Sequence, residues 1–146
     1  TEVLVRIIRN FGFVPYELYG QYDVVVVVDI DGNIEDLYKS YIRPINLIEG
    51  VRCVTYPAVL SWCSSAEEKV FAFVLIDTDP RFLDDVYGDM TKVQGVKSVS
   101  LVLGITDIIA EVNARDKEDL NRILQSIWAI NGVNRTTSLI CLSSTI

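Results

Sequence analysis

The stretch Asp23–Val28, DVVVVV, returns later in the chain as Asp107–Val112, DIIAEV, and this recurrence decides the fold. The two stretches lie 84 positions apart (107 − 23 = 84), and each has a glycine three residues ahead of it, Gly20 or Gly104. A repeat of this length is longer than the units of solenoid proteins, so it indicates a duplicated domain.

A helical pattern follows each of these stretches and ends at Gly50 or Gly132, 82 positions apart (132 − 50 = 82). A chain of 146 residues has room for two small domains, and the repeat favours that division. We therefore expect a first unit at residues 1–62, a linker at 63–69 and a second unit at 70–146.

The second unit holds a complete set of elements. Strands are expected at residues 70–76, 96–103, 107–114 and 133–142, from apolar runs and alternating patterns. Asp79 and Asp116 are placed to cap two helices, which end at Gly95 and Gly132. The resulting order, β-α-β-β-α-β, is the α+β split βαβ plan. It gives a ferredoxin-like, four-stranded antiparallel sheet with both helices on one face.

The first unit follows the same plan from its second element onward. Its first helix is expected at 1–10, and its strands at 13–19, 22–30 and 51–60. The second helix has an apolar face of Tyr38, Tyr41, Ile42, Ile45 and Ile48. Pro44 should bend this helix or break one hydrogen bond, at a cost of about 3 kcal/mol if unrelieved. The first strand is central in this topology, and we expect it in residues upstream of Thr1.

Three strands are apolar at consecutive positions, so both of their faces carry hydrophobic side chains. Helices cover one face of each sheet, and a large apolar second face usually marks an interface. We expect the sheets to pack face to face, either between the two units of one chain or between chains. Self-association into a dimer or a larger oligomer follows from this expectation.

Composition excludes several classes of function. The net charge of −7, with 13 scattered basic residues, argues against nucleic-acid binding by this chain itself. The chain has no histidine and no glycine-rich phosphate loop, so we expect no enzyme activity, no cofactor and no metal. Three cysteines without CxxC spacing suggest reduced thiols in a cytoplasmic protein. The longest apolar run, Val24–Val28, is too short to cross a membrane.

The two Gly-x-x-Asp turns, Gly20–Asp23 and Gly104–Asp107, are the best local candidates for a binding site. Each offers exposed backbone groups and one carboxylate, so an amino acid could place its ammonium group on the aspartate and its carboxylate on nearby N–H groups. The same residues are also ordinary turn formers, and turn chemistry alone would explain them.

Residues 70–142 resemble the effector-binding (RAM) domain of the Lrp/AsnC transcription regulators. The resemblance rests on Gly104–Asp107 opening an apolar strand, on the helix containing Glu118-Asp119-Leu120, and on Gly132–Thr137, GVNRTT. It implies sheet-face pairing, assembly into larger rings and binding of an amino acid near the Gly-x-x-Asp turn. The first unit departs from the pattern after Gly50-Val51, which leaves its ligand role in doubt.

The leading hypothesis is a tandem ligand-sensing and oligomerisation module of an Lrp/AsnC-like regulator that binds a small amino acid or related metabolite. DNA would be contacted only through an upstream segment or a partner. The candidate ligand-binding residues are Gly104, Thr106, Asp107, Thr136 and Thr137 in the second unit, and Gly20, Tyr22 and Asp23 in the first. The alternative is a structural interaction module that binds no ligand and assembles with a DNA-binding partner.

Overall fold

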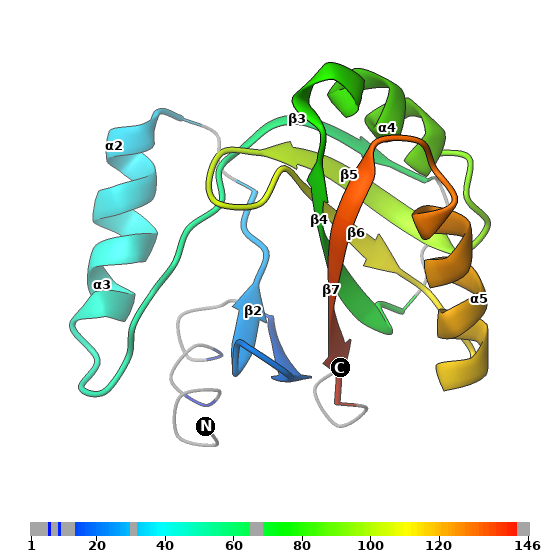
Figure 1. Cartoon of the computed structure of the whole chain (residues 1–146). Coiled ribbons are helices and arrows are strands. Elements are labelled where there is room, and N and C mark those ends of the chain that lie inside the picture. The colour runs from blue at the N-terminus through cyan, green and yellow to red at the C-terminus, as the bar shows by residue number, and fades with distance from the viewer. Residues whose placement is uncertain (1–5, 7–8, 10–13, 30–31, 65–68, 143–146) are drawn as a thin grey trace.

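The computed structural model describes residues 6, 9, 14–29, 32–64 and 69–142 (Figure 1). The strands are β1 (Pro15–Tyr19), β2 (Val24–Val26), β3 (Ala58–Cys63), β4 (Ala72–Thr78), β5 (Val96–Val102), β6 (Ile108–Val112) and β7 (Val133–Cys141). The helical elements are α2 (Ile34–Leu37), the π-helical turn η1 (Tyr38–Ile42), α3 (Arg43–Asn46), the 3₁₀ turn η2 (Pro80–Phe82), α4 (Leu83–Met90) and α5 (Lys117–Trp128).

The second unit has the expected ferredoxin-like arrangement. Its strands lie in the order β7-β4-β6-β5, and each neighbouring pair is antiparallel. The two helices, α4 and α5, cover one face of this sheet (Figure 1). Their inward side chains pack with those of the strands around a core in which Ile76, Val86 and Ile123 are fully buried. The α+β prediction for residues 70–142 is therefore confirmed.

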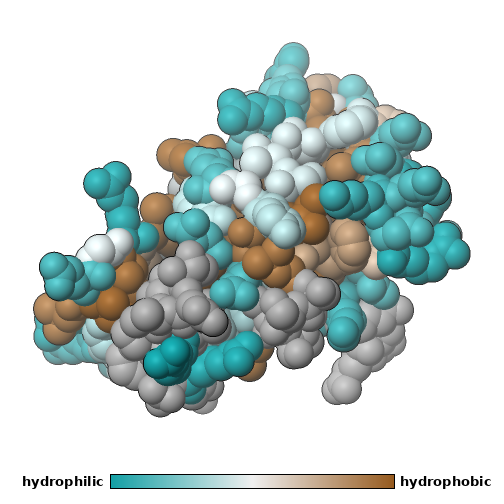
Figure 2. Space-filling view, turned by 90° about the horizontal axis from the view of Figure 1, so that it is seen from below, coloured by the Kyte–Doolittle hydropathy of each residue, from teal (hydrophilic) through white to brown (hydrophobic). Residues whose placement is uncertain are grey.

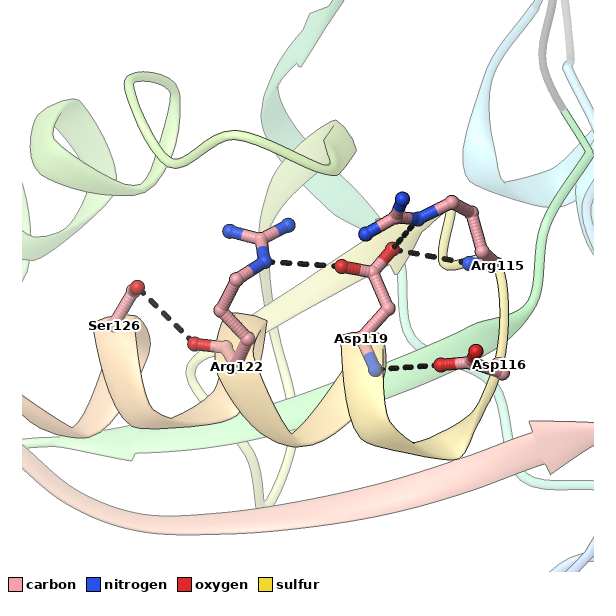
Figure 3. Close-up of polar contacts among 5 residues, drawn as sticks. All are labelled: Arg115, Asp116, Asp119, Arg122 and Ser126. Carbon is pink, nitrogen blue, oxygen red and sulfur yellow. Dashed lines mark hydrogen bonds and ion pairs between the residues drawn. The ribbon is translucent and has the colours of Figure 1, made fainter.

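The start of α5 is fixed by its own polar side chains (Figure 3). Asp116 is the N-cap, and its carboxylate accepts a hydrogen bond of 2.8 Å from the backbone N–H of Asp119. Asp119 in turn accepts from the backbone N–H of Arg115 and from Nε of Arg122, both at 3.0 Å. The bond from Asp119 N to Asp116 satisfies a backbone N–H group that the first turn of a helix leaves open, so the predicted cap at Asp116 is confirmed.

The strands of the first unit extend the sheet of the second unit at both edges. Among the described residues, one sheet holds seven strands in the order β2-β1-β7-β4-β6-β5-β3. Leu18 of β1 pairs with Cys141 of β7, and β3 pairs with β5 along most of its length. The expected separate sheet for the first unit is not seen, because no described strand lies between β2 and β3 to join them.

The β1–β2 hairpin also packs on the face of the sheet opposite the helices. Leu18, Phe73 and Leu139 form a second buried cluster there, with Tyr16 packed against it. The rings of Tyr16 and Phe73 meet edge to face, with centroids 5.3 Å apart. Part of the second apolar face is therefore covered within the chain itself.

The helical segment of the first unit differs from α5 in both regularity and burial. The backbone N–H of Arg43 bonds to the carbonyl of Tyr38, five residues back, so a π turn precedes Pro44. This irregularity is the disturbance predicted for Pro44, whose ring has no N–H and crowds the preceding turn. None of the residues of Ile34–Asn46 is buried, so the apolar face predicted for this helix is only half covered.

Two strands of the first unit differ from those predicted, and one of them, β2, covers only Val24–Val26 of the expected residues 22–30. β3 begins at Ala58 and runs to Cys63, whereas the sequence suggested a strand at 51–60. Pro57 stands directly before Ala58 and lacks the N–H that a strand donates, which explains the late start. The helix expected at 1–10 lies outside the described residues except for Arg6 and Arg9, which are helical.

The repeat is also visible in the backbone hydrogen bonds. Leu18 N donates to Asp23 O at 3.0 Å across the first turn, and Val102 N donates to Asp107 O at the same distance across the second. These donors and acceptors are both 84 positions apart, as in the sequence (102 − 18 = 107 − 23 = 84). The two turns therefore share their local geometry as well as their residues.

Candidate functional site

The Gly104–Asp107 turn connects β5 to β6 at one end of the sheet. Gly104 has φ +151°, a conformation that other residues rarely adopt. The aromatic ring of Tyr56 lies directly on this glycine, because a Cβ added there would stand 2.8 Å from Cδ1 of Tyr56. Glycine is thus required both by the backbone conformation and by the close approach of the ring.

Asp107 and Thr106 attach this turn to the end of β4. Oδ2 of Asp107 accepts a hydrogen bond of 2.9 Å from the backbone N–H of Thr78. Thr106 is only 4% exposed. Its hydroxyl lies 3.2 Å from the carbonyl oxygen of Ile76 and 3.1 Å from Oδ1 of Asp77. The proton of Thr106 and one oxygen of Asp107 are therefore engaged within the protein.

Tyr56 connects this turn to its counterpart in the first unit. Tyr22 stands in the Gly20–Asp23 turn, and its hydroxyl lies 2.8 Å from the hydroxyl of Tyr56. Burial of Tyr56, its contact with Tyr22 and the negative charge of Asp77 together raise the pKa of Tyr56 to about 12. The structure therefore brings the two predicted turns together through one tyrosine pair.

Thr136 and Thr137 lie on opposite faces of the sheet. Thr136 pairs with Ile76 on the helix-covered face, and its Oγ1 accepts a hydrogen bond of 2.6 Å from Nε1 of Trp128. Thr137 pairs with Leu75 and shares the other face. Thr137 is therefore the one of the two threonines that faces the side of the hairpin.

Asp77 and Arg135 complete the polar group at this end of the sheet. Arg135 lies opposite Asp77 in the β4–β7 register, and the arginine is exposed. Because paired residues of neighbouring antiparallel strands share a face, both belong to the face that carries Leu75. The exposed guanidinium of Arg135 and the carboxylates of Asp77 and Asp107 thus stand at the same end of the sheet.

Sequence reasoning missed Tyr56 and Asp77 as members of this group. Asp77 follows directly from the apolar run of β4, and a carboxylate at the end of a buried strand is a signal that could have been used. Tyr56 gives no such signal, because it lies where the first unit departs from the repeat. Its position follows only from the pairing of β3 with β5.

The described residues include no group of three or more side chains placed to hold a metal ion. Their cysteines, Cys53, Cys63 and Cys141, form no disulfide. No helix in the described ranges is long and apolar enough to cross a membrane.

Residues 71–146 match the family described as the Lrp/AsnC ligand binding domain. The match spans more than half of the sequence. The chain belongs to this family. One similar protein is an HTH-type transcriptional regulator of Pyrococcus abyssi. It is 32% identical to this chain over 76 residues, which are 51% of this chain and 48% of that protein.

A second group of relatives consists of enzymes that contain a similar segment. Homocitrate synthases of Sulfolobus acidocaldarius and Saccharolobus islandicus are each 35% identical to the chain over 75 residues. The aligned segment is 50% of this chain and only 16% of either synthase. The chain thus spans about half or less of the curated relatives that it matches. What the match shows for residues 71–146 is a ligand-binding domain of the Lrp/AsnC family.

Proposed function

We propose that this chain is the ligand-sensing and oligomerisation module of an Lrp/AsnC-like transcription regulator, and that it binds a small amino acid or a related metabolite. The binding site is the end of the sheet where the Gly104–Asp107 turn meets Tyr56. DNA is contacted by a different part of the regulator or by a partner, since the net charge of −7 disfavours phosphate contacts by this chain.

The observation that carries the proposal is the combination of opposite charges at this end of the sheet. Asp77 and Asp107 are joined there through Thr106 and the backbone of Thr78, and carboxylates attract an ammonium group. Arg135 stands opposite Asp77, and a guanidinium binds a carboxylate with two parallel hydrogen bonds. An amino acid carries both of the groups that these side chains recognise.

A thermal-shift measurement with each of the twenty amino acids tests this proposal. A ligand at a hundred times its dissociation constant stabilises the folded state by about 2.7 kcal/mol, which raises the melting temperature of a domain of this size by several degrees. Arg135→Gln should abolish the shift, because it removes the partner of the ligand carboxylate. Arg52→Gln, which changes an exposed arginine of the first unit, should leave it unchanged. If no amino acid raises the melting temperature, the result contradicts an amino-acid ligand and favours the alternative, a structural interaction module.

The match to homocitrate synthases favours a second candidate function. In this alternative the chain is the effector-binding part of a biosynthetic enzyme, and the same site would sense a metabolite for that enzyme. The ligand screen does not separate the two functions, but the coding sequence adjoining the chain does. A helix-turn-helix supports the regulator, whereas a catalytic domain supports the enzyme.

A further inference from the structure

The loop that follows α5 contains an asparagine directly before a glycine. Asn131-Gly132 is the one Asn-Gly pair in the sequence. Asn131 is exposed, and no described group bonds to its side-chain amide. The backbone nitrogen of the next residue can attack an asparagine amide, and a glycine favours this attack because it has no Cβ to crowd the approach. The reaction needs a nitrogen that is free and a side chain that can rotate.

The backbone nitrogen of Gly132 donates no hydrogen bond to any described residue. The neighbouring bonds bypass it, since Ile130 N donates to Ile127 O at 3.0 Å and Val133 N donates to Ile130 O at 3.3 Å. The exposed side chain of Asn131 can turn its Cγ toward this nitrogen. Both reacting groups are therefore available in the folded chain.

The opposite side of Gly132 is tightly packed. Its carbonyl accepts a hydrogen bond of 2.8 Å from the backbone N–H of Asp79, the N-cap of η2. A Cβ added to Gly132 would stand 2.4 Å from Cβ of Phe82 and 3.2 Å from Cγ2 of Val86. This glycine thus joins the end of α5 to η2 and α4. Because the packing leaves no spare room, a longer main chain at residue 131 would displace these contacts.

We propose that Asn131 is a site of self-modification, where the side chain condenses with Gly132, loses ammonia and becomes aspartate or isoaspartate, which loosens the contact between α5 and η2. The nitrogen of Gly132 loses its proton and bonds to Cγ of Asn131, while the bond from Cγ to Nδ2 breaks and ammonia leaves. Water then opens the five-membered imide ring. Opening at Cγ gives aspartate, and opening at the backbone carbonyl of residue 131 gives isoaspartate. Water is the only reagent that the reaction consumes.

Both products disturb the end of α5. Aspartate puts a negative charge beside the helix C-terminus, where the macrodipole already has its negative end. Isoaspartate directs the main chain through Cβ and Cγ and so lengthens it by one carbon atom. Gly132 then loses either its place beside Phe82 or its bond to Asp79. These effects do not depend on whether the chain binds a ligand.

The first unit has the same turn without the packing. Glu49-Gly50 lies 82 positions earlier (131 − 49 = 82), and Val51 N donates to Ile48 O at 3.2 Å across it. Nothing lies within 4 Å of a Cβ added to Gly50. No residue of α2 to α3 is buried, and Figure 2 shows hydrophobic surface on the part of the molecule that holds this segment, at the left of the view. Glu49→Asn therefore places the reactive pair where its products have little to disturb.

Incubation of the folded chain in mildly alkaline buffer, followed by peptide mass spectrometry, tests the reaction. Trypsin releases residues 123–135 as one peptide, which holds both Asn131 and Asn134. Asn131 should lose ammonia at least about tenfold faster than Asn134, which precedes the bulkier Arg135 and is held in β7. Asn131→Gln cannot close a five-membered ring and should give no product at this position.

The incubated chain should also show the structural consequence. The backbone amide of Asp79 should exchange with solvent faster in the converted molecules, and the melting temperature should fall as conversion proceeds. Asn131→Gln controls for other damage during incubation and should show neither change. In Glu49→Asn, conversion at residue 49 should add no further fall in the melting temperature.

Two results would overturn the inference. The first is conversion of Asn131 that is no faster than that of Asn134 in the folded chain. Fast conversion in urea alone would then show that the fold protects the pair. The second is complete conversion of Asn131 that leaves the exchange of the Asp79 amide and the melting temperature unchanged.

Discussion

The first and second units share their turns and helix ends but differ in how much they bury. The second unit places its helix residues in a closed core, with Ile123 and Ile127 fully buried. The first unit makes the same turn with the same backbone hydrogen bond across it, yet none of the residues of α2 to α3 is buried. Local sequence signals therefore suffice to form turns and helix ends. Burial needs a complete sheet, because a helix is stabilised mainly by the surface that it packs against.

The largest difference between the units should appear at matched core positions. Ile127 and Ile45 are 82 positions apart in the repeat (127 − 45 = 82), and only Ile127 is fully buried. Ile127→Ala should cost about 2–5 kcal/mol of the free energy of unfolding, the usual range for a buried isoleucine. Ile45→Ala should cost clearly less. Chemical denaturation of both variants measures the difference, and equal losses would mean that both helices are equally packed in solution.

Alanine substitutions of the glycines that end the two helices should show a smaller difference in stability cost. Gly132 has φ +104°, and an added Cβ would stand 2.4 Å from Cβ of Phe82. Gly50 has φ +80° with nothing within 4 Å of an added Cβ. Gly50→Ala should therefore cost about 1–2 kcal/mol for the left-handed backbone alone. Gly132→Ala should cost the same amount for the backbone and about 1–3 kcal/mol more for overpacking against Phe82.

Thermal unfolding of these two variants provides the measurement. Gly50→Ala should lower the melting temperature more than Gly132→Ala only if Phe82 can move aside freely while the backbone at Gly50 cannot adjust. That outcome would place the tighter helix end in the first unit and contradict the comparison.

The same difference in burial explains what could be predicted from the sequence. The order of elements in residues 70–142 followed from periodicity and from caps such as Asp79 and Asp116, because those signals act within a few residues. The joining of β1 to β7 and of β3 to β5 could not be predicted, since each pairing depends on edges formed by distant segments. The position of Tyr56 in the site could not be predicted either, because it depends on the pairing of β3 with β5. The candidate turns were found because their glycines and aspartates are local signals.

Tyr56 allows a test of the contact between the two turns. Its pKa is raised from about 10 to about 12, so the neutral phenol stabilises the folded state. This stabilisation is complete below pH 10 and should be lost as pH rises through about 12. Tyr22→Phe removes the hydrogen-bond partner and should lower the pKa of Tyr56.

The ultraviolet absorbance of tyrosinate, followed during an alkaline titration, measures this effect. Tyr56→Phe should remove the late-titrating group while its ring remains on Gly104. Tyr38→Phe changes a partly exposed tyrosine in the helical segment of the first unit. It is the control, and the late-titrating group should still be seen in this variant. A titration that Tyr22→Phe does not alter would show that the two turns are not joined through this pair in solution.

The smallest expected effect concerns the first turns of the two matched helices. Hydrogen bonds from Arg115 and Arg122 lower the pKa of Asp119 to about 2, so its charged form stabilises the folded state. This contribution is present above about pH 4 and is lost as pH falls through about 2. Asp119→Asn should therefore reduce the loss of stability on acidification. Asp36 holds the same place in α2, where its carboxylate accepts a hydrogen bond only from the backbone N–H of Asn33, at 3.4 Å, so Asp36→Asn should change the free energy of unfolding less than Asp119→Asn does. Urea unfolding between pH 2 and 5 compares the two, and a larger effect at Asp36 would mean that α2, not α5, has the more firmly held first turn.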